Sequence, residues 1–490
     1  MSEREHHPVN GLEVVLNLVM HTGGPETPFT IARVSPTWQE FAEKWILKYL
    51  HTDSSNIRKV MEFLGGRPER FGLVRTLAYR INLPTYTAID CTRQESNLNQ
   101  LWNNQAFTQA IRLLFDELRK WPATGRTLTL ELFPTSTSDM MKLVDDVWVR
   151  DQFGVAIPGD VIYFRHFGST LECYQTFQGR IPCVTKICVS GDSERYLAVS
   201  AFRHFFQTFC NLREVDIKFW DHYKREPVEF RQEKRRRMAE TLHLMPAGVT
   251  DFKFHVLYAT QAAQELDPPN IMPEGEESDP LTVAFRQVSQ RLTVVRVHGM
   301  LGTPELFWPF RIDAHNPEPF WPSLEYMEVY YHIVNPKGEW IFTSEDETED
   351  WPPGAEPRFE AHESIHDWPD SIGYPEEDEW FYQDRIVADP RHMDGFYTSV
   401  AYAISKMPKL KQMRLHAIVY WETKLSPMHC FEYKRQGEQA IASWYALHRY
   451  KPSDSVLRDW EGMASAQGLD LEMRFKEPDF DEDYQRHEWD

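Results

Sequence analysis

Residues 397–415 read YTSVAYAISKMPKLKQMRL and contain the pattern that decides the fold. Up to Met407 the apolar residues recur at helical spacing, and Pro408 then interrupts the helix. Beyond the proline, Leu410, Met413 and Leu415 follow the order apolar-x-x-apolar-x-apolar, which is typical of a strand with one buried face. The stretch therefore predicts an amphipathic helix, a break and a strand.

The same helix–break–strand unit recurs along the chain. Three apolar positions match easily by chance in a chain that is 42% hydrophobic, so the informative feature is the helix that precedes the strand. One such unit cannot cover its apolar face, whereas stacked units bury it between neighbours. The other predicted helices are 107–121, 198–210, 229–244 and 281–289, and the other predicted strands are 74–79, 128–132, 184–189, 212–217, 249–254, 292–297 and 324–329.

The spacing of these units is irregular. Consecutive strands lie 28 to 86 residues apart, far from the 20–29 residues of an ordinary leucine-rich-repeat array. We therefore expect an α/β fold of the irregular leucine-rich-repeat-like solenoid type, with insertions. A doubly wound α/β domain also alternates helices and strands and is the alternative architecture.

The negative charge of the chain is concentrated in three segments. Lys and Arg number 53 against 74 Asp and Glu, which gives a formal charge of −21. Residues 345–384 hold fifteen acidic residues and one basic, residues 264–280 hold six acidic and no basic, and residues 477–490 hold seven acidic and one basic. We interpret them as two acidic inserts and an acidic tail on the surface. The remainder shows no basic stripe, which argues against a nucleic-acid partner.

One basic cluster, 224–237, stands out against this background. Its pair at 224–225 and its run at 234–237 are spaced like a bipartite nuclear import signal. The alternative is the polar face of the predicted helix 229–244, with Phe230, Met238 and Leu242 turned inward. The two interpretations can coexist.

Cysteine usage and hydropathy indicate an intracellular protein. The six cysteines form no CxxC pair and no disulfide framework, so we expect reduced thiols. No stretch approaches the ~18–20 apolar residues of a membrane span, and the first residues lack a secretory signal. We expect the protein in the cytoplasm or, if the basic cluster acts as an import signal, in the nucleus.

The N-terminal region differs from the repeats. Residues 12–19 read LEVVLNLV, a Gly23-Gly24-Pro25 turn follows, and residues 31–41 read IARVSPTWQEF. This order resembles an F-box, in which a short helix, a loop and a Val-Ser-x-x-Trp helix follow one another. Asn10-Gly11 stands where F-boxes carry Leu-Pro, so the element is degenerate. Two small helices that cap the end of the solenoid would give a similar pattern.

The resemblance extends over most of the chain, from about residue 28 to residue 475. Residues 73–84, 103–121, 128–132 and 388–410 are similar to a fungal family of F-box proteins with an irregular leucine-rich-repeat-like region. The family resemblance implies a substrate receptor of an SCF-type ubiquitin ligase, which binds a Skp-type adaptor through the F-box and a client through the repeats. It implies an F-box-like segment at 1–55, a solenoid at 56–476 and an acidic tail at 477–490. A repeat scaffold without a ligase role is the alternative.

Two binding surfaces follow from this interpretation. The adaptor-binding residues are expected to be Leu12, Val15, Leu16, Val34 and Trp38. The client is expected on the sheet face opposite the helices, because the residues that alternate with the apolar positions of a strand point away from the core. We expect it across the later strands, at Arg296, Tyr326, Tyr330 and Arg414. The alternative is that these four are solvated surface residues.

One string has the form of a catalytic motif. His362-Glu363-Ser364-Ile365-His366 fits H-E-x-x-H, in which two imidazoles one helical turn apart hold zinc and the glutamate activates water. It lies in the Pro-rich acidic insert, where only a short helix could form, so we interpret it as two solvated histidines in a loop. A zinc metalloenzyme is the distant alternative. No GxSxG, GxxxxGK[ST] or GxGxxG motif is present, and we expect no catalytic residue, metal or cofactor.

Overall fold

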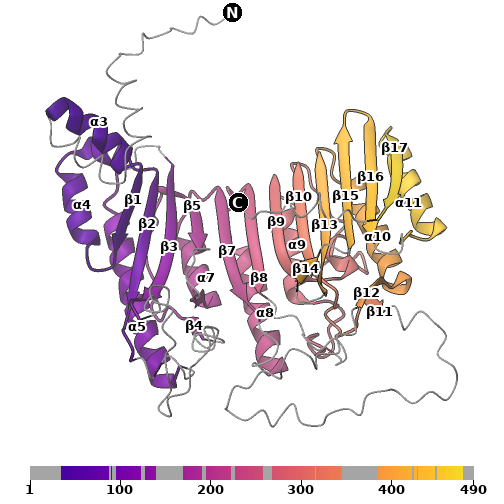
Figure 1. The fold of residues 1–490 in the computed structure, drawn as a ribbon, viewed down its shortest axis with the longest axis horizontal. Coiled ribbons are helices and arrows are strands. Elements are labelled where there is room, and N and C mark those ends of the chain that lie inside the picture. Colours follow the sequence, from indigo (N-terminus) through magenta and orange to yellow (C-terminus); the bar gives the residue numbers. More distant parts are fainter. Residues whose placement is uncertain are drawn as a thin grey trace, which may run out of the picture. The chain divides into compact units, whose positions relative to one another are not determined.

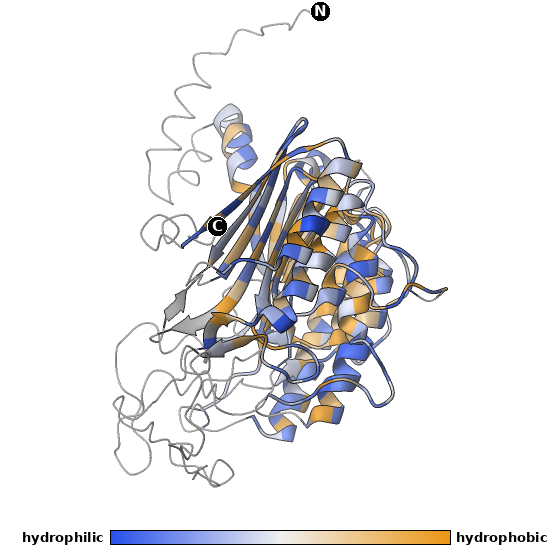
Figure 2. Cartoon of the chain, turned by 90° about the vertical axis from the view of Figure 1, so that its right-hand side faces the viewer, coloured by the Kyte–Doolittle hydropathy of each residue, from blue (hydrophilic) through white to orange (hydrophobic). Residues whose placement is uncertain are grey.

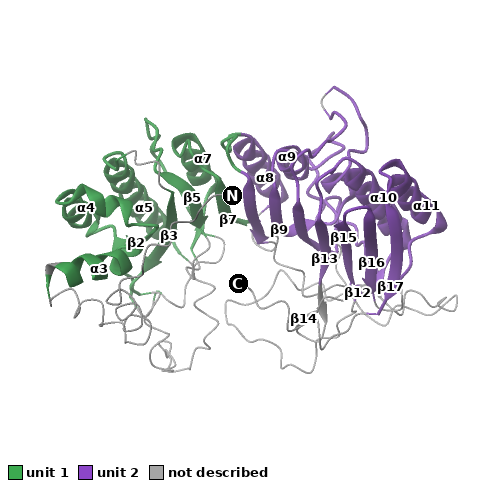
Figure 3. Cartoon of the chain, turned by 90° about the horizontal axis from the view of Figure 1, so that it is seen from above, with its two compact units in different colours: residues 1–220, 244–249 green, residues 221–243, 250–490 purple. Residues whose placement is uncertain are grey.

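The computed structural model describes residues 35–87, 90, 95–122, 127–138, 169–189, 195–221, 227–257, 268–314, 316–344, 385–421, 424–426, 429–446 and 450–477 (Figure 1). The chain divides into two compact units, shown in green and purple in Figure 3. Unit 1 comprises residues 1–220 and 244–249, and unit 2 comprises residues 221–243 and 250–490. Residue 55, the predicted end of the F-box-like segment, lies within unit 1. That segment boundary stays a prediction.

Unit 1 is built on a parallel sheet whose strands follow one another in chain order, β1-β2-β3-β5-β7. A separate short parallel pair joins β4 and β6. The elements are α3 (Pro36–Ile46), β1 (Tyr49–Asp53), α4 (Ile57–Gly65), the 3-10 helix η1 (Pro68–Gly72), β2 (Thr76–Leu83), α5 (Asn97–Leu118), β3 (Leu128–Ser136), β4 (Thr170–Leu171), β5 (Val184–Val189), β6 (Tyr196–Leu197), α7 (Val199–Thr208) and β7 (Glu214–Trp220).

Unit 2 carries a mixed sheet in the order β8-β9-β10-β13-β15-β16-β17. Its pairs are parallel from β8 to β13 and again between β16 and β17, whereas β15 is antiparallel to both neighbours. The elements are α8 (Val228–His243), β8 (Asp251–Leu257), α9 (Pro280–Ser289), β9 (Val294–Leu301), the 3-10 helix η4 (Pro304–Leu306), β10 (Tyr326–His332), β11 (Phe342–Ser344), β12 (Arg385–Ala388), α10 (Pro390–Ser405), β13 (Gln412–Trp421), β14 (Lys424–Ser426), β15 (His429–Gln436), β16 (Gln439–Ala446), α11 (Asp454–Ala466) and β17 (Asp470–Lys476).

The predicted apolar positions form the core of each unit. In unit 2, Val295 pairs in register with Met327 and Met327 with Met413, and all three are fully buried. Burial alternates residue by residue along β8, and along β10 up to its last two residues, which are both buried. The strands carry both hydrophobic and hydrophilic residues (Figure 2). The helix and strand predictions are therefore confirmed, and the fold is mixed α/β with mostly parallel sheets.

Most of the helices lie on one face of each sheet, whereas α3 lies apart from them beside the first strands (Figure 3). In unit 1, α4, α5 and α7 occupy the same side, and in unit 2 so do α8, α9, α10 and α11 (Figure 3). The doubly wound alternative needs crossover helices on both faces of its sheet. These helices leave the opposite face of the strands without that covering layer, and we call it the open face.

Capping residues and prolines in the sequence mark the first residues of several helices. Ser35 caps α3 by accepting a hydrogen bond from the Trp38 backbone N–H at 3.3 Å, and Ser96 caps α5 in the same way. Asp279 and Asp389 cap α9 and α10, and each is followed by a proline at the first helical position. A short polar acceptor followed by proline satisfies and pre-orders the first turn of a helix.

A glycine sets the local path of β9. Gly299 has φ +83°, and a Cβ built on it would lie 1.8 Å from the Val256 carbonyl oxygen. The pairing of β9 with β10 shifts by one residue at this point, between Tyr330 and Tyr331. Tyr330, before the shift, is partly exposed on the open face, whereas Tyr331 and His332, after it, are both buried.

The basic helix α8 departs from expectation in two positions. Met238 and Leu242 are buried as predicted, but Phe230 is 57% exposed, so its predicted inward position is wrong. Arg235, expected on the polar face, is 1% exposed and lies in the core. Its guanidinium donates to both carboxylate oxygens of Asp279, at 2.9 and 2.6 Å, and also to Asp221. Asp279, expected in a solvated insert, is therefore part of a buried ion cluster.

The described part of the chain contains no helix that is both long enough and apolar enough to cross a membrane.

Candidate functional site

The predicted client residues lie together on the open face of unit 2. Strand register places side chains in rows that run across the strands, and two rows matter most. The charged row contains Lys253, Arg296, Glu328, Arg414 and Glu432 on β8, β9, β10, β13 and β15. The ring row contains His255, His298, Tyr330 and His416 on β8, β9, β10 and β13.

Ion pairs hold the arginines of the charged row. Arg296 lies 3.4 Å from Asp251, and its guanidinium lies over the Tyr326 ring, 5.3 Å from the centroid. Arg414 donates from Nε to Glu432 at 3.0 Å and lies 4.0 Å from Glu328. Because these pairs cross from strand to strand, they fix the orientation of the guanidinium groups on the face.

Ion pairing keeps Arg414 and Glu432 charged near neutral pH. Burial would lower the pKa of Arg414, but the hydrogen bond and charge of Glu432 raise it above its usual value. Burial would raise the pKa of Glu432, but Lys434 and Arg414 lower it. Burial, together with the charge of Glu328, raises the pKa of Tyr326 to about 12. The phenol therefore stays neutral. From β9 to β15 the charged row carries alternating positive and negative groups, whereas Lys253 on β8 adds a second positive charge beside Arg296.

The ring row is closely packed, and its His298 ring is uncharged at neutral pH. Tyr330 stacks on His416 with ring centroids 4.4 Å apart and planes at 11°, and it lies 5.2 Å from His298. Burial lowers the pKa of His298 to about 4. His416 is only 3% exposed, so its ring offers almost no accessible surface. The accessible positions of the predicted client site are therefore those near Arg296 and Arg414.

The open face offers binding groups, and the described residues show no assembled catalytic or metal cluster on it. No group of three or more His, Cys, Asp or Glu side chains that could hold a metal is found in the ranges the structure describes. The His362–His366 string lies outside the described residues, so the expectation that it binds no zinc stays a prediction. Ion pairs and aromatic rings on a sheet face can recognise a polypeptide or another folded surface.

Of the predicted adaptor residues, Trp38 is the one that the structure describes. It lies on α3, half-buried, where it packs with Phe41, Trp45 and Ile46 around the buried Ala42. Arg70 anchors this helix, because its guanidinium makes two hydrogen bonds to the Glu43 carboxylate, at 3.0 and 2.6 Å. Leu12, Val15, Leu16 and Val34 lie outside the described residues. Residues Pro36–Ile46 form a helix that Ser35 caps, and the role of this helix as an adaptor surface stays a prediction.

Sequence reasoning missed the contribution of β15 to the surface. Glu432 and Lys434 extend the charged network beyond β13, with Lys434 Nζ 2.6 Å from Glu432. The strand is antiparallel and follows no helix, so it lacks the signal used to find the others. The alternation of Phe431 and Tyr433 with polar residues could have identified it.

Taken together, the fold and this surface define a mixed α/β protein with an open, ion-paired sheet face. Residues 382–489 match the model of a family described as of unknown function, DUF6546. The match spans β12 to β17, with α10 and α11, and therefore includes part of the open face of unit 2. A search of the curated proteins gives no match. The family match lies outside the F-box-like segment, so the resemblance to F-box proteins stays a proposal.

Proposed function

We propose that the chain is a protein-recognition subunit that binds a client on the open face of unit 2. The observation that carries this proposal is the charged row, in which Arg296 and Arg414 are half-exposed and held in place by carboxylates on neighbouring strands. Fixed guanidinium groups beside aromatic rings form favourable anchors at protein interfaces, because little side-chain entropy is lost on binding.

We further propose that the architecture is an irregular leucine-rich-repeat-like solenoid and that the chain acts as a substrate receptor of an SCF-type ubiquitin ligase. Strands in chain order, helices on one face and an open opposite face support the repeat interpretation. Ser35 and Trp38 at the start of α3 support the F-box-like interpretation. A repeat scaffold that binds clients without a Skp-type adaptor uses the same open face and is the competing proposal.

Adaptor binding separates these two proposals. When the full chain and a Skp-type adaptor are expressed together, the wild-type protein should co-purify with the adaptor at micromolar concentrations. Replacing Val34 and Trp38 with alanine should abolish the complex, because it removes the apolar contacts of the docking face. Thr37→Ala, an exposed position on the same helix, is the matched control and should leave binding unchanged. The absence of any wild-type complex would favour the scaffold.

Client binding can be tested on the open face itself. Some proteins that co-purify with the wild-type chain should no longer co-purify with Arg296→Ala. The same proteins should be lost with Arg414→Ala. The fold should tolerate Arg296→Ala, since its pair with Asp251 is largely solvent-exposed and such a pair contributes only about 0–1 kcal/mol. Arg414→Ala leaves the part-buried Glu432 with Lys434 as its partner, so circular dichroism must show that this variant is folded. Lys186→Ala is the matched control, because Lys186 forms a similar exposed cross-strand pair with Glu214 at 2.9 Å in unit 1. An equal loss with Lys186→Ala would contradict a site in unit 2.

A further inference from the structure

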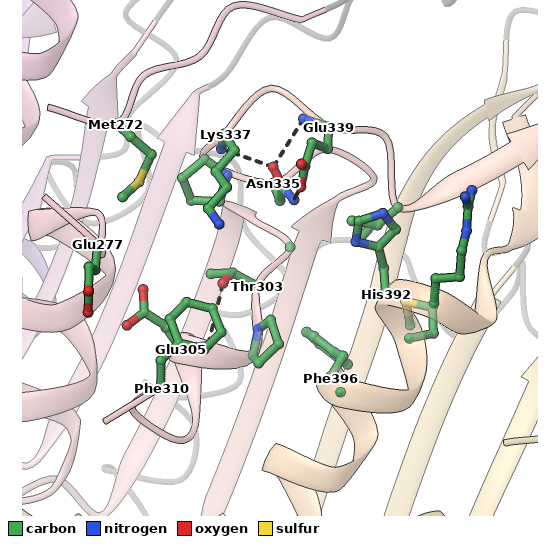
Figure 4. Close-up of a pocket in the computed structure, with 17 residues that line it drawn as sticks. Met272, Glu277, Thr303, Glu305, Phe310, Asn335, Lys337, Glu339, His392 and Phe396 are labelled. Atoms are coloured by element: carbon green, nitrogen blue, oxygen red, sulfur yellow. Dashed lines mark hydrogen bonds between the residues drawn. The ribbon is translucent and has the colours of Figure 1, made fainter. Parts of the chain in front are cut away.

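Unit 2 contains a pocket that is separate from the charged row. It has a volume of about 280 Å³ and lies where β9 and β10 end, between η4, the connection from β10 to β11 and the first turn of α10 (Figure 4). The carboxyl ends of parallel strands commonly place loops and side chains around ligands. The volume is just below the ~300 Å³ at which sites for drug-sized ligands begin, so it suits one side chain or a small organic ion.

The pocket contains a buried carboxylate that lacks a close cation. Glu305 is 3% exposed, and its Oε1 accepts a hydrogen bond from the Ser278 hydroxyl. Among the described residues, no Lys, Arg or His nitrogen forms an ion pair with it. Arg286 donates instead to the Glu305 backbone carbonyl and to the Asn316 side chain. Burial raises the pKa of Glu305, and the hydrogen bond from Ser278 and the charge of Arg286 offset this only in part.

The other charges around the pocket leave its lining net negative. Arg391 is neutralised by Asp389, with Nη2 2.6 Å from the carboxylate, and Lys337 is exposed at the rim. Glu277 and Glu339 add two exposed carboxylates to the lining. In Figure 4, Glu277 and Glu305 lie on one side of Thr303, and His392 lies on the other side. A cation that enters on the acidic side would therefore meet Glu277 and Glu305, whose negative charge Lys337 offsets only in part.

The walls beside Glu305 are apolar. Phe310, Pro304 and Phe396 line the pocket, and the Phe310 side chain is 59% exposed although it is a large aromatic group. An aromatic ring can hold a cation over its face and can pack against a methylene chain. The lining thus combines a buried carboxylate with apolar walls.

We propose that this pocket binds an ammonium or guanidinium group on a short apolar stem, with the cation against Glu305 and the stem against Phe310. A lysine or arginine side chain of a protein and a free alkylamine share this chemistry. The pocket is distinct from the proposed client face. A negative result for the adaptor or client proposal would therefore leave this proposal unaffected, and the reverse also holds.

Titration calorimetry on the full chain tests the proposal. The probes are Nα-acetyl-arginine amide, Nα-acetyl-lysine amide and the neutral, nearly isosteric Nα-acetyl-citrulline amide. The two cationic probes should bind at least tenfold more tightly than the citrulline probe. Glu305→Gln should weaken their binding at least tenfold. Glu276→Gln, an exposed change in the same acidic segment but outside the lining, should leave it unchanged.

A second set of variants keeps the test decisive if Glu305→Gln does not fold. Glu277→Gln and Phe310→Ala alter exposed side chains of the lining, and each should weaken the cationic probes severalfold. Agmatine distinguishes the source of the ligand. Agmatine binding as tight as that of the arginine amide indicates a free amine, and much weaker agmatine binding indicates a protein side chain. Equal affinity for citrulline, or no binding at millimolar concentration, would overturn the proposal.

Discussion

Replacing Arg235 with methionine is expected to destabilise unit 2 by about 3–5 kcal/mol, the usual cost of removing one partner from a buried ion pair. The guanidinium of Arg235 bridges Asp221 and Asp279, and none of the three residues is more than 1% exposed. Burial alone would raise the pKa of Asp221, but the charges of Arg235 and Arg231 lower it to about 2. Without Arg235, Asp279 loses its guanidinium partner in the core, and Asp221 keeps only its ion pair with Arg231. Urea unfolding followed by circular dichroism measures the loss.

The matched control is Arg236→Met on the same helix. Arg236 is exposed, and it pairs with Glu233 at 2.7 Å and with Glu240. Pairs of this kind contribute about 0.3–0.5 kcal/mol, so the control should unfold almost like the wild-type chain. If both variants lost the same stability, the core position of Arg235 would be wrong.

The strands could be predicted because their signal is local. A residue such as Met413 is fully buried, and its neighbours Gln412 and Arg414 on the strand are only partly buried. Burial thus follows the period of two that a strand imposes on the sequence. The predicted strand phase, and with it the placement of Arg296 and Tyr326 on the open face, depended only on that period.

The buried ion cluster could not be predicted, because its partners are distant in the sequence. Arg235 sits in a run of basic residues, and such a run normally marks a solvated face. Its acceptors, Asp221 and Asp279, are 14 and 44 residues away. Nothing in the local pattern distinguishes Arg235 from Arg236. The same limit applies to Glu305, which is buried although it lies in the connection between β9 and β10.

Acid is expected to destabilise unit 2 well above the pH at which its buried aspartates protonate. Burial lowers the pKa of His332 and that of His429 to about 3, against about 6.5 in an unfolded chain. Below pH 6.5 these two histidines therefore bind protons in the unfolded chain but not in the folded protein. The free energy of unfolding decreases as the pH is lowered. Each of the two histidines should lower the free energy of unfolding at pH 5 by about 2 kcal/mol relative to its value at pH 8. Asp221, whose pKa is about 2, adds to the loss only below about pH 4.

Urea unfolding at pH 8 and pH 5 measures this loss, with intrinsic fluorescence as the probe because Trp321, Trp444 and Trp460 of unit 2 are fully buried. His429→Phe removes one titrating ring from an aromatic environment that includes Phe342, 5.3 Å away between ring centroids. This variant should lose about 2 kcal/mol less than the wild-type chain between the two pH values, whatever its stability at pH 8. His51→Gln on the exposed surface of β1 should retain the full loss, since its ring is not buried. An identical loss in His429→Phe and the wild-type chain would show that His429 is protonated in the folded protein, and the buried position of its ring would then be wrong.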